Sequence, residues 1–417
     1  METWKWALNM FRKLLSLEEA RAEVDQLKLD TLGSEEVLLL KAHNRVLAQD
    51  VVSALDIPPF NRSTVDGYAV KATDTFGAAE KNPVCLKVCG IVNIGELPKV
   101  NVLTGQTAEI VTGAPIPEGA DAVVMVEDTE KSGEELHVFS VVTKGENVMS
   151  KGADIKTNEI VLRAGQILCS REIGVLAALG IAKVKVYVIP TVAVLSTGGE
   201  VTEPGKSLPS GKIYDINAYS LYSAVLECGG NPLYLGVVPD DKFKLRETMQ
   251  QALKCADVIV TSGGVSVGPK DLMPQTVASL GEPGLLFSGV AIKPGKPTTL
   301  AMVNGKVVFA LPGHPTSALL MFQLLVRPVV WRLSGRTAAE PAVVKAVAGM
   351  RMFSAKGRRT FVMVKLHKND SDRYVADMVE TGASGAITTL AKADGYVEVP
   401  EDVQFVDKDE EVEVALF

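Results

Sequence analysis

Residues 257–271 read DVIVTSGGVSVGPKD, and this stretch predicts how the centre of the chain folds. An apolar, β-branched run leads into two glycines, which are followed by hydroxyl side chains, a lysine and an aspartate. Such a run is typical of a buried parallel strand that ends in a flexible loop. Open α/β sheets bind anionic ligands at the carboxyl ends of their strands, so this loop is a candidate site for a phosphate group and a metal ion.

Strand and helix patterns alternate on both sides of this stretch. Further strands are predicted over 191–196, 232–238 and 307–313, and helices over 217–230, 240–256, 271–281 and 314–335. Asp240 is the expected cap of the second of these helices. Alternation of this kind predicts a central, doubly wound, mostly parallel α/β domain with helices on both faces of its sheet.

The remaining segments predict a multidomain α/β protein. Short strands without helical periodicity predict a β domain inserted at 55–148. We expect residues 1–54 together with 149–188 to form a segmented linker or dimerisation domain. The α/β domain then covers 189–335, and renewed strand patterns over 336–417 predict a C-terminal β barrel.

Composition excludes several classes of protein. The 417 residues carry a formal net charge of -7 without long runs of one sign, which argues against a nucleic-acid-binding protein. No apolar run approaches the ~20 residues that a membrane span needs, and Lys5, Arg12 and Lys13 interrupt the N-terminal segment, which does not resemble a signal peptide. Five cysteines without a CxxC pair favour a reducing, cytoplasmic location.

Cysteine and histidine show no recognisable metal motif. Cys85 and Cys89 lie four residues apart on a predicted strand, and filling of the core is favoured over a metal pair. His43, His137 and His367 belong to no motif. The pattern therefore indicates neither a zinc site nor a histidine base.

Three strand-to-loop transitions in the α/β domain carry small and polar residues. They comprise Ser196, Thr197, Gly198 and Glu200 in the first; Ser262, Gly263, Gly264, Ser266, Gly268 and Asp271 in the second; and Pro312, Gly313 and Ser317 in the third. Any one of them alone is best interpreted as a capped turn. Three at one sheet edge favour an anion-binding site, although neither a P-loop nor a dinucleotide fingerprint is present.

Lysines and carboxylates extend this pattern. Lys293 and Lys296 flank a Pro-Gly turn in AIKPGKP (291–297), which suits a bound oxyanion, although a solvated surface turn fits equally well. Carboxylates stand beside glycines at Asp66, Asp154, Glu200, Asp240 and Asp271. Such groups meet phosphates through Mg²⁺, or they simply form turns.

Taken together, these motifs resemble the molybdopterin molybdenumtransferases, the MoeA family, to which the gephyrin E domain also belongs. The resemblance rests on STVDGYAV, TGAPIPEGADAVV, KGADI, STGGEV, IYDIN, TSGGVSVGPKD, AIKPGKP and LPGHPTSA, in this order and spacing. It covers nearly the whole chain. It implies an elongated homodimer that inserts molybdate into adenylylated molybdopterin with Mg²⁺ and releases AMP. A molybdopterin adenylyltransferase and target molybdoenzymes become possible partners.

The resemblance also implies roles for individual residues. Asp66 and Thr112, with Asp154 nearby, would reach the cleft from the β domain of the partner subunit. Glu200, Asp240 and Asp271 would face the nucleotide and metal, and Glu200 and Asp271 would be the metal ligands. Gly263, Gly264, Ser266 and Gly268 would cradle phosphates, Lys293 and Lys296 would bind anionic groups, and Pro312, Gly313 and Ser317 would form the pocket floor. Arg358 and Ser384 are weaker matches in the barrel.

The chain departs from many relatives at three places. It has TGGE where they have TGDE, Ser288-Gly289 where they have a bulkier basic residue, and LPGHP where they have LPGNP. Tungstate therefore remains an alternative to molybdate. ATP-dependent adenylylation of molybdopterin and a non-catalytic scaffold are the other two alternatives.

Overall fold

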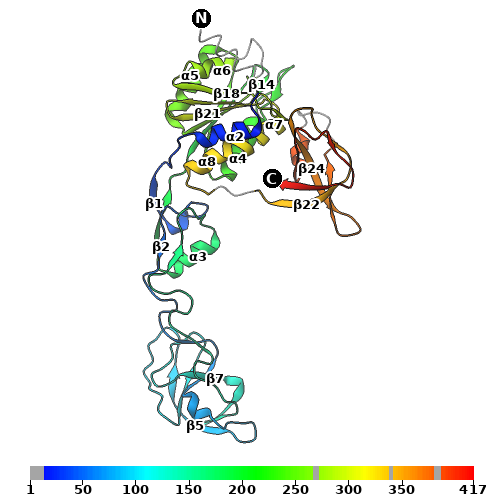
Figure 1. Ribbon diagram of the computed structural model, residues 1–417. Coiled ribbons are helices and arrows are strands. Elements are labelled where there is room, and N and C mark those ends of the chain that lie inside the picture. The colour runs from blue at the N-terminus through cyan, green and yellow to red at the C-terminus, as the bar shows by residue number, and fades with distance from the viewer. Residues whose placement is uncertain (1–13, 266–271, 338–340, 380–386) are drawn as a thin grey trace.

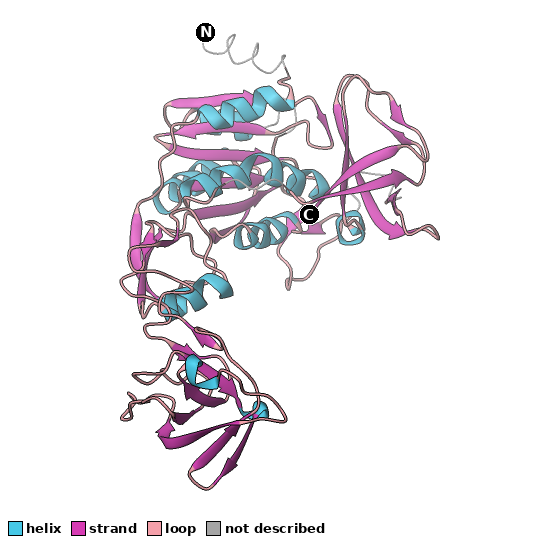
Figure 2. Cartoon of the chain, turned by 60° about the horizontal axis from the view of Figure 1, so that its bottom comes forward, coloured by secondary structure: helices cyan, strands magenta, loops and turns pink. Residues whose placement is uncertain are grey.

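The protein is elongated, with two compact parts at one end and a long arm leading to a third (Figure 1). The computed structural model describes residues 14–265, 272–337, 341–379 and 387–417. The α/β part and the C-terminal barrel lie side by side, and the inserted β domain is at the far end of the arm (Figures 1 and 2).

The α/β domain is built on a six-stranded sheet. Its order is β16 (Asn231–Val238), β13 (Thr191–Thr197), β17 (Val258–Ser262), β21 (Lys306–Leu311), β20 (Thr299–Val303) and β18 (Pro283–Ser288). The first four strands are parallel, whereas β20 and β18 add an antiparallel edge. This arrangement confirms the predicted mostly parallel sheet.

Side-chain alternation along β13 explains why helices cover both faces of the sheet. Val192 and Val194 point into one core with α4 (Asn217–Glu227), α7 (Pro315–Met321) and α8 (Arg327–Leu333). Ala193 and Leu195 point into the other core with α5 (Lys242–Cys255) and α6 (Leu272–Ala278). These four side chains are fully buried, as expected for a strand that lies between two helical layers.

One long apolar helical stretch belongs to the first of these cores. Residues Pro315–Leu333, which include a π-helical turn at Phe322–Val326, are the one described helix that is long and apolar enough to span a membrane by length and composition. However, 67% of its apolar window is buried inside the protein. Its hydrophobic surface is therefore used to cover the sheet.

The first described helix, α2 (Leu17–Gln26), also packs on the α/β domain. Ser16 and Glu19 form a capping box at its start. Leu17, Ala20 and Val24 join the core under α4 and α8. The sequence assigned this helix to the linker segment 1–54, but its apolar face packs elsewhere. The predicted domain limits, including this one, stay a prediction.

The arm is formed by two distant segments that pair with each other. β1 (Ser34–Leu38) pairs with β12 (Lys183–Tyr187), and β2 (Val51–Val52) pairs with β11 (Ile160–Leu162). Helix α3 (Ser170–Ala178) packs against them. The chain thus runs out along the arm and returns beside itself.

The inserted domain contains a second six-stranded sheet. Its order is β7 (Ala122–Met125), β4 (Gly67–Val70), β6 (Gln106–Ile110), β5 (Val84–Val92), β9 (Glu135–Val138) and β8 (Thr129–Ser132). The expectation that Cys85 fills the core is wrong. Strand alternation points Leu86 into the core, where it is 3% exposed, so Cys85 faces solvent.

The C-terminal strands close into a five-stranded barrel. β24 (Arg359–Lys368), β25 (Tyr374–Met378), β22 (Val343–Ala348), β28 (Glu411–Leu416) and β26 (Gly395–Val399) pair in this order, and β26 pairs back to β24. The predicted barrel is therefore confirmed. A two-residue strand from the α/β domain, β19 (Ile292–Lys293), pairs in parallel with β24 and attaches the barrel.

Candidate active site

The three predicted loops meet at one edge of the α/β sheet. β13, β17 and β21 are adjacent parallel strands, and Ser196 lies in register with Ser262, which lies in register with Leu311. The three loops therefore begin side by side, as the sequence predicted. The strand order alone brings the starts of the three loops together.

Two glycines allow the first and second loops to touch. Gly263 has φ +92°, and a Cβ built there would lie 2.3 Å from the Thr197 carbonyl oxygen. Gly264 has φ +65°, and its Cβ would lie 2.9 Å from Thr197 Oγ1. Any side chain at Gly263 would push the two loops apart, so this position requires glycine for both conformation and space.

Asn217, at the start of α4, holds the second and third loops together. Its Nδ2 donates to Ser262 Oγ at 2.8 Å and to the Gly313 carbonyl oxygen at 2.6 Å. Ser262 Oγ in turn donates to the Pro312 carbonyl oxygen at 3.1 Å. Asn217 is the last residue of the IYDIN motif, but the motif alone does not predict this role.

Asp215, two residues earlier, anchors the first loop from below. Ser196 Oγ donates to Asp215 Oδ1 at 2.8 Å, and the Ala218 backbone N–H donates to the same oxygen at 3.1 Å. Tyr234 donates to the other oxygen at 3.5 Å. Burial, together with the nearby Asp215 charge, raises the pKa of Tyr234, which therefore stays a protonated donor. Ser196 is thus used to hold the loop.

Two exposed carboxylates flank the double glycine of the first loop. Asp240 Oδ2 accepts the Gly199 backbone N–H at 3.0 Å. The expected helix cap at Asp240 is wrong, because Asp241 caps α5 by accepting from the backbones of Phe243 and Lys244. Glu200 folds back over Gly198, where an added Cβ would lie 2.8 Å from Glu200 Oε2. Asp240 is thereby left at the sheet edge beside Glu200.

The lysine turn faces these loops from the barrel side. Lys293 lies on β19, in register with Thr360 of β24. Thr298 Oγ1 donates to the Gly295 carbonyl oxygen at 2.8 Å and closes the turn. Gly295 packs so tightly that a Cβ would lie 2.7 Å from Met321 Sδ. Among the described residues, no carboxylate forms a salt bridge with Lys293 or Lys296, and both lysines line the cleft described next.

A cleft of about 1370 Å³ lies between the α/β domain and the barrel. From the sequence-predicted set it collects Glu200, Gly263, Gly264, Lys293, Lys296, Pro312, Gly313, Ser317 and the weaker match Arg358. Its floor contains Thr316, which is 4% exposed and whose Oγ1 has no hydrogen-bond partner among the described residues. The volume exceeds the ~300–1,000 Å³ of common ligand pockets, so the cleft can take a large ligand.

Three predicted residues lie far from this cleft within the chain. Asp66 precedes β4 and Thr112 follows β6 in the inserted domain, which lies at the other end of the molecule (Figure 1). Asp154 donates its backbone N–H to the Ile57 carbonyl oxygen, where the two chain segments lead from the arm into this domain. The Thr112 backbone N–H and hydroxyl both donate to Asp66 Oδ1, at 2.6 and 2.8 Å, and these bonds lower the pKa of Asp66. Asp66 is therefore an exposed, fixed negative charge.

Part of the predicted site cannot be placed. Ser266, Gly268 and Asp271 of the second loop, and Ser384 of the barrel, lie outside the described residues. The roles of the placed residues also stay predictions. The structure establishes their positions: the loops lie at one edge of the sheet, with carboxylates on one side and lysines on the other.

The mostly parallel sheet and the cleft between it and the barrel define a multidomain α/β protein with an interdomain ligand site. The sequence matches the families described as "MoeA N-terminal region (domain I and II)" over residues 15–180, "Probable molybdopterin binding domain" over 193–332 and "MoeA C-terminal region (domain IV)" over 345–417. The chain belongs to the MoeA family, an enzyme family of molybdenum cofactor biosynthesis.

Individual relatives agree over most of their length. The chain is 34% identical to molybdopterin molybdenumtransferases of Nostoc (92% of this chain, 89% of the relative) and Staphylococcus aureus (87% and 86%). The crystal structure of the molybdopterin biosynthesis MoeA protein of Pyrococcus horikoshii OT3 is 35% identical. It has a TM-score of 0.83 and covers 97% of this chain and 100% of its own. The relatives from Nostoc and Staphylococcus aureus are transferases by name.

Proposed function

We propose that this protein inserts molybdate into adenylylated molybdopterin and releases AMP with the help of Mg²⁺. The observation that carries the proposal is the interdomain cleft, in which glycine loops face a pair of lysines without described ion pairs. Molybdate, a pterin phosphate and AMP are all anionic. A cleft with uncompensated lysines and close backbone N–H groups suits several anions at once.

The lysines and the glycine loops take different parts in this proposal. Lys293 and Lys296 offset the repulsion between molybdate and the phosphorylated pterin, and Arg358 adds a third cation at the barrel wall. Gly263 and Gly264 let the phosphate approach the backbone closely. Asn217 and Asp215 act as positioning residues, because they hold the loops and do not themselves line the cleft.

Glu200 and Asp240 fit a magnesium ion. Glu200 follows β13 and Asp240 follows β16, and both are exposed carboxylates beside Gly199. Glu200 lines the cleft, and neither carboxylate forms a salt bridge with a described cation. Oxygen ligands of this kind suit Mg²⁺, which keeps several waters and binds phosphates jointly with one or two carboxylates. When bound, the ion would neutralise phosphate charge. Asp271 is the further ligand that the sequence proposes, outside the described residues.

Asp66, Thr112 and Asp154 complete the proposal only in a homodimer. They stand exposed at the far end of the arm, so a second subunit must present them to the cleft of the first. Mixed dimers test this arrangement, with Asp66→Ala in one subunit and Lys293→Ala in the other. A shared site predicts that mixed dimers regain activity that neither parent dimer has. Mixed dimers as inactive as both parents would show that the two residues serve one subunit's site.

The direct test is AMP release from adenylylated molybdopterin, run with molybdate and with tungstate, each with and without Mg²⁺. We expect release that requires both the oxyanion and Mg²⁺, with the preferred oxyanion giving the faster rate. AMP release at the same rate with and without an oxyanion would overturn the proposal. Pyrophosphate formed from ATP and molybdopterin would instead indicate adenylylation, and no turnover by folded protein would indicate a scaffold.

The remaining parts of the proposal concern the setting of the reaction. A cytoplasmic protein that receives its substrate from a molybdopterin adenylyltransferase and delivers its product to molybdoenzymes fits this chemistry. Co-purification with an adenylyltransferase, compared between wild type and Lys293→Ala, would test the first of these contacts.

A further inference from the structure

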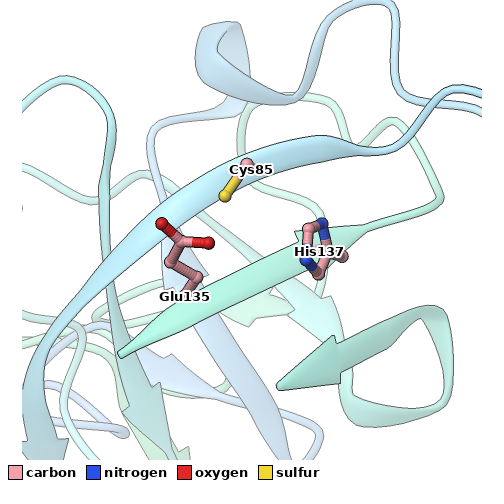
Figure 3. Close-up of side chains that lie close together, drawn as sticks. All are labelled: Cys85, Glu135 and His137. Atoms are coloured by element: carbon pink, nitrogen blue, oxygen red, sulfur yellow. The ribbon is translucent and has the colours of Figure 1, made fainter. Parts of the chain in front are cut away.

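A second cluster of reactive side chains lies on the inserted domain, at the opposite end of the molecule from the cleft. Cys85 on β5 and Glu135 and His137 on β9 point toward one another from neighbouring strands (Figure 3). One ligand atom from each residue, a sulfur, a carboxylate oxygen and a ring nitrogen, lies within 4.8 Å of the other two. The cluster shares no residue with the cleft.

Strand register explains why these three side chains meet. Cys85 is directly opposite His137 in the antiparallel β5–β9 pair, and Glu135 precedes His137 by two residues on the same strand. All three therefore project from one face of the sheet. Leu136, between the two β9 ligands, is fully buried on the other face. The cluster is thus held by two paired strands of a packed sheet and not by a mobile loop.

The charges around the cluster leave its groups available. Lys87 is opposite Glu135 on β5, but its ammonium pairs at 3.5 Å with Glu134 in the adjoining turn. Glu130 on β8 is opposite His137 on the other side, so negative charge borders the cluster there too. A divalent cation would relieve this local excess of negative charge.

We propose that Cys85, Glu135 and His137 bind a zinc ion. One thiolate, one imidazole and one carboxylate are the three ligand types that Zn²⁺ takes in proteins, and three protein ligands leave a fourth tetrahedral position for water. Mg²⁺ and Ca²⁺ prefer oxygen ligands alone and do not suit this set. The cysteine proton leaves as the Zn–S bond forms, so each zinc that binds releases one proton from Cys85.

Bound zinc would join β5 to β9 across the solvent face of the sheet. Because the ligands are already converged in the folded domain and dispersed in the unfolded chain, zinc binds the folded state preferentially. We therefore expect zinc to raise the melting temperature of the wild-type protein. This effect is independent of molybdate and of the lysine turn.

The test uses the full-length protein after removal of metal with a chelator. Zn²⁺ affinity is measured by competition with a chromophoric chelator, and Co²⁺ is used as a spectroscopic substitute whose thiolate charge-transfer absorption reports a Co–S bond. We expect one such site in the wild type. Cys85→Ser should abolish the charge-transfer absorption, and Glu135→Gln and His137→Gln should each weaken zinc binding about tenfold or more.

Matched controls separate this cluster from other cysteines and histidines. Cys255→Ser removes another exposed cysteine, and His367→Gln removes another histidine beside a carboxylate, 3.4 Å from Asp377. Both variants should keep the cobalt absorption and wild-type zinc affinity. Metal-free circular dichroism checks that each variant is folded.

Two results would overturn the proposal. The first is a wild-type protein whose cobalt spectrum lacks thiolate charge transfer. The second is a folded Glu135→Gln or His137→Gln variant with unchanged zinc affinity. If Cys85→Ser does not fold, these two results still decide the matter, because neither depends on that variant.

Discussion

The sheet edge of the α/β domain and the inserted β domain present their polar groups in different ways. At the sheet edge, residues from four separate stretches meet, and glycines and Asn217 hold the backbones in close contact. In the inserted domain, Asp66 is held by two hydrogen bonds from Thr112, which lies just after the adjacent strand β6 in the same domain. The first arrangement depends on the whole tertiary structure. The second depends on the pairing of two adjacent strands, β4 and β6.

The largest effect is expected when the loop contact itself is broken. Gly263→Ala adds a Cβ 2.3 Å from the Thr197 carbonyl oxygen at φ +92°. Strain and overpacking should together lower the free energy of unfolding by about 3 kcal/mol and abolish activity. Gly77→Ala is the matched control, because Gly77 has φ +91° and no atom within 4 Å of its added Cβ. It should cost only ~1 kcal/mol. Equal losses in denaturant titrations would mean that φ alone matters.

A smaller effect is expected from Asn217→Ala, which removes both hydrogen bonds that join the second and third loops. The Ser262 hydroxyl and the Gly313 carbonyl both lose the Asn217 donor, although Ser262 keeps its bond to Pro312, so we expect a loss of about 2 kcal/mol and a clear fall in activity. Asn231→Ala removes one exposed side-chain bond, to Thr191 at 3.3 Å, and should cost well under half as much. Unchanged activity in folded Asn217→Ala would show that the loops do not need this clamp.

The third-largest effect is expected at Asp240 and Asp241, where substitution should affect activity in one case and stability in the other. Asp241→Ala removes the cap of α5 and should cost about 1 kcal/mol of stability while activity is unchanged. Asp240→Ala should lower activity and the response to Mg²⁺ more than it lowers stability. Thermal unfolding and AMP release measured on both variants sharpen the contrast. A fall in activity in Asp241→Ala alone would reverse the assignment.

The smallest effect concerns the charge at the far end of the arm. Thr112→Val removes the hydroxyl that donates to Asp66, so the lowered pKa of Asp66 should rise toward its ordinary value. Because the folded-state pKa is depressed, the stabilising contribution of Asp66 is present above the unfolded-state pKa and disappears as the pH falls through the folded value. Carbon-13 NMR titration of the carboxyl group measures this shift. An unchanged pKa would assign the whole effect to the Thr112 backbone N–H.

Local patterns predicted the elements of the fold better than they predicted the contacts. The β-branched runs at 191–196 and 257–262 identified buried strands correctly, because burial on both faces is written into each run. Convergence of the three loops also followed, since parallel strands share one edge. The choice between Asp240 and Asp241 as helix cap did not follow, because either residue fits the pattern and only the backbone course decides.

The residues that the sequence did not reveal make contacts with partners far away in the sequence, and those contacts depend on how the strands pair. Asn217 looks like an ordinary residue at a helix start, and its contact with Gly313 spans 96 positions. The usual burial of free cysteines predicts Cys85 in the core, and that prediction is wrong because β5 turns Leu86 inward instead. His137 has no motif around it, and its proximity to Cys85 exists only through the pairing of β5 with β9.

The two-residue strand β19 places Lys293 on the seam between two domains, since Ile292 and Lys293 pair with Arg359 and Thr360 of the barrel. A tilt of the barrel must therefore displace this ammonium group along with the wall of the cleft. The width of the cleft and the positive charge that lines it would therefore change together. Under the proposed function, entry of the pterin and binding of its anionic groups would both depend on this one movement.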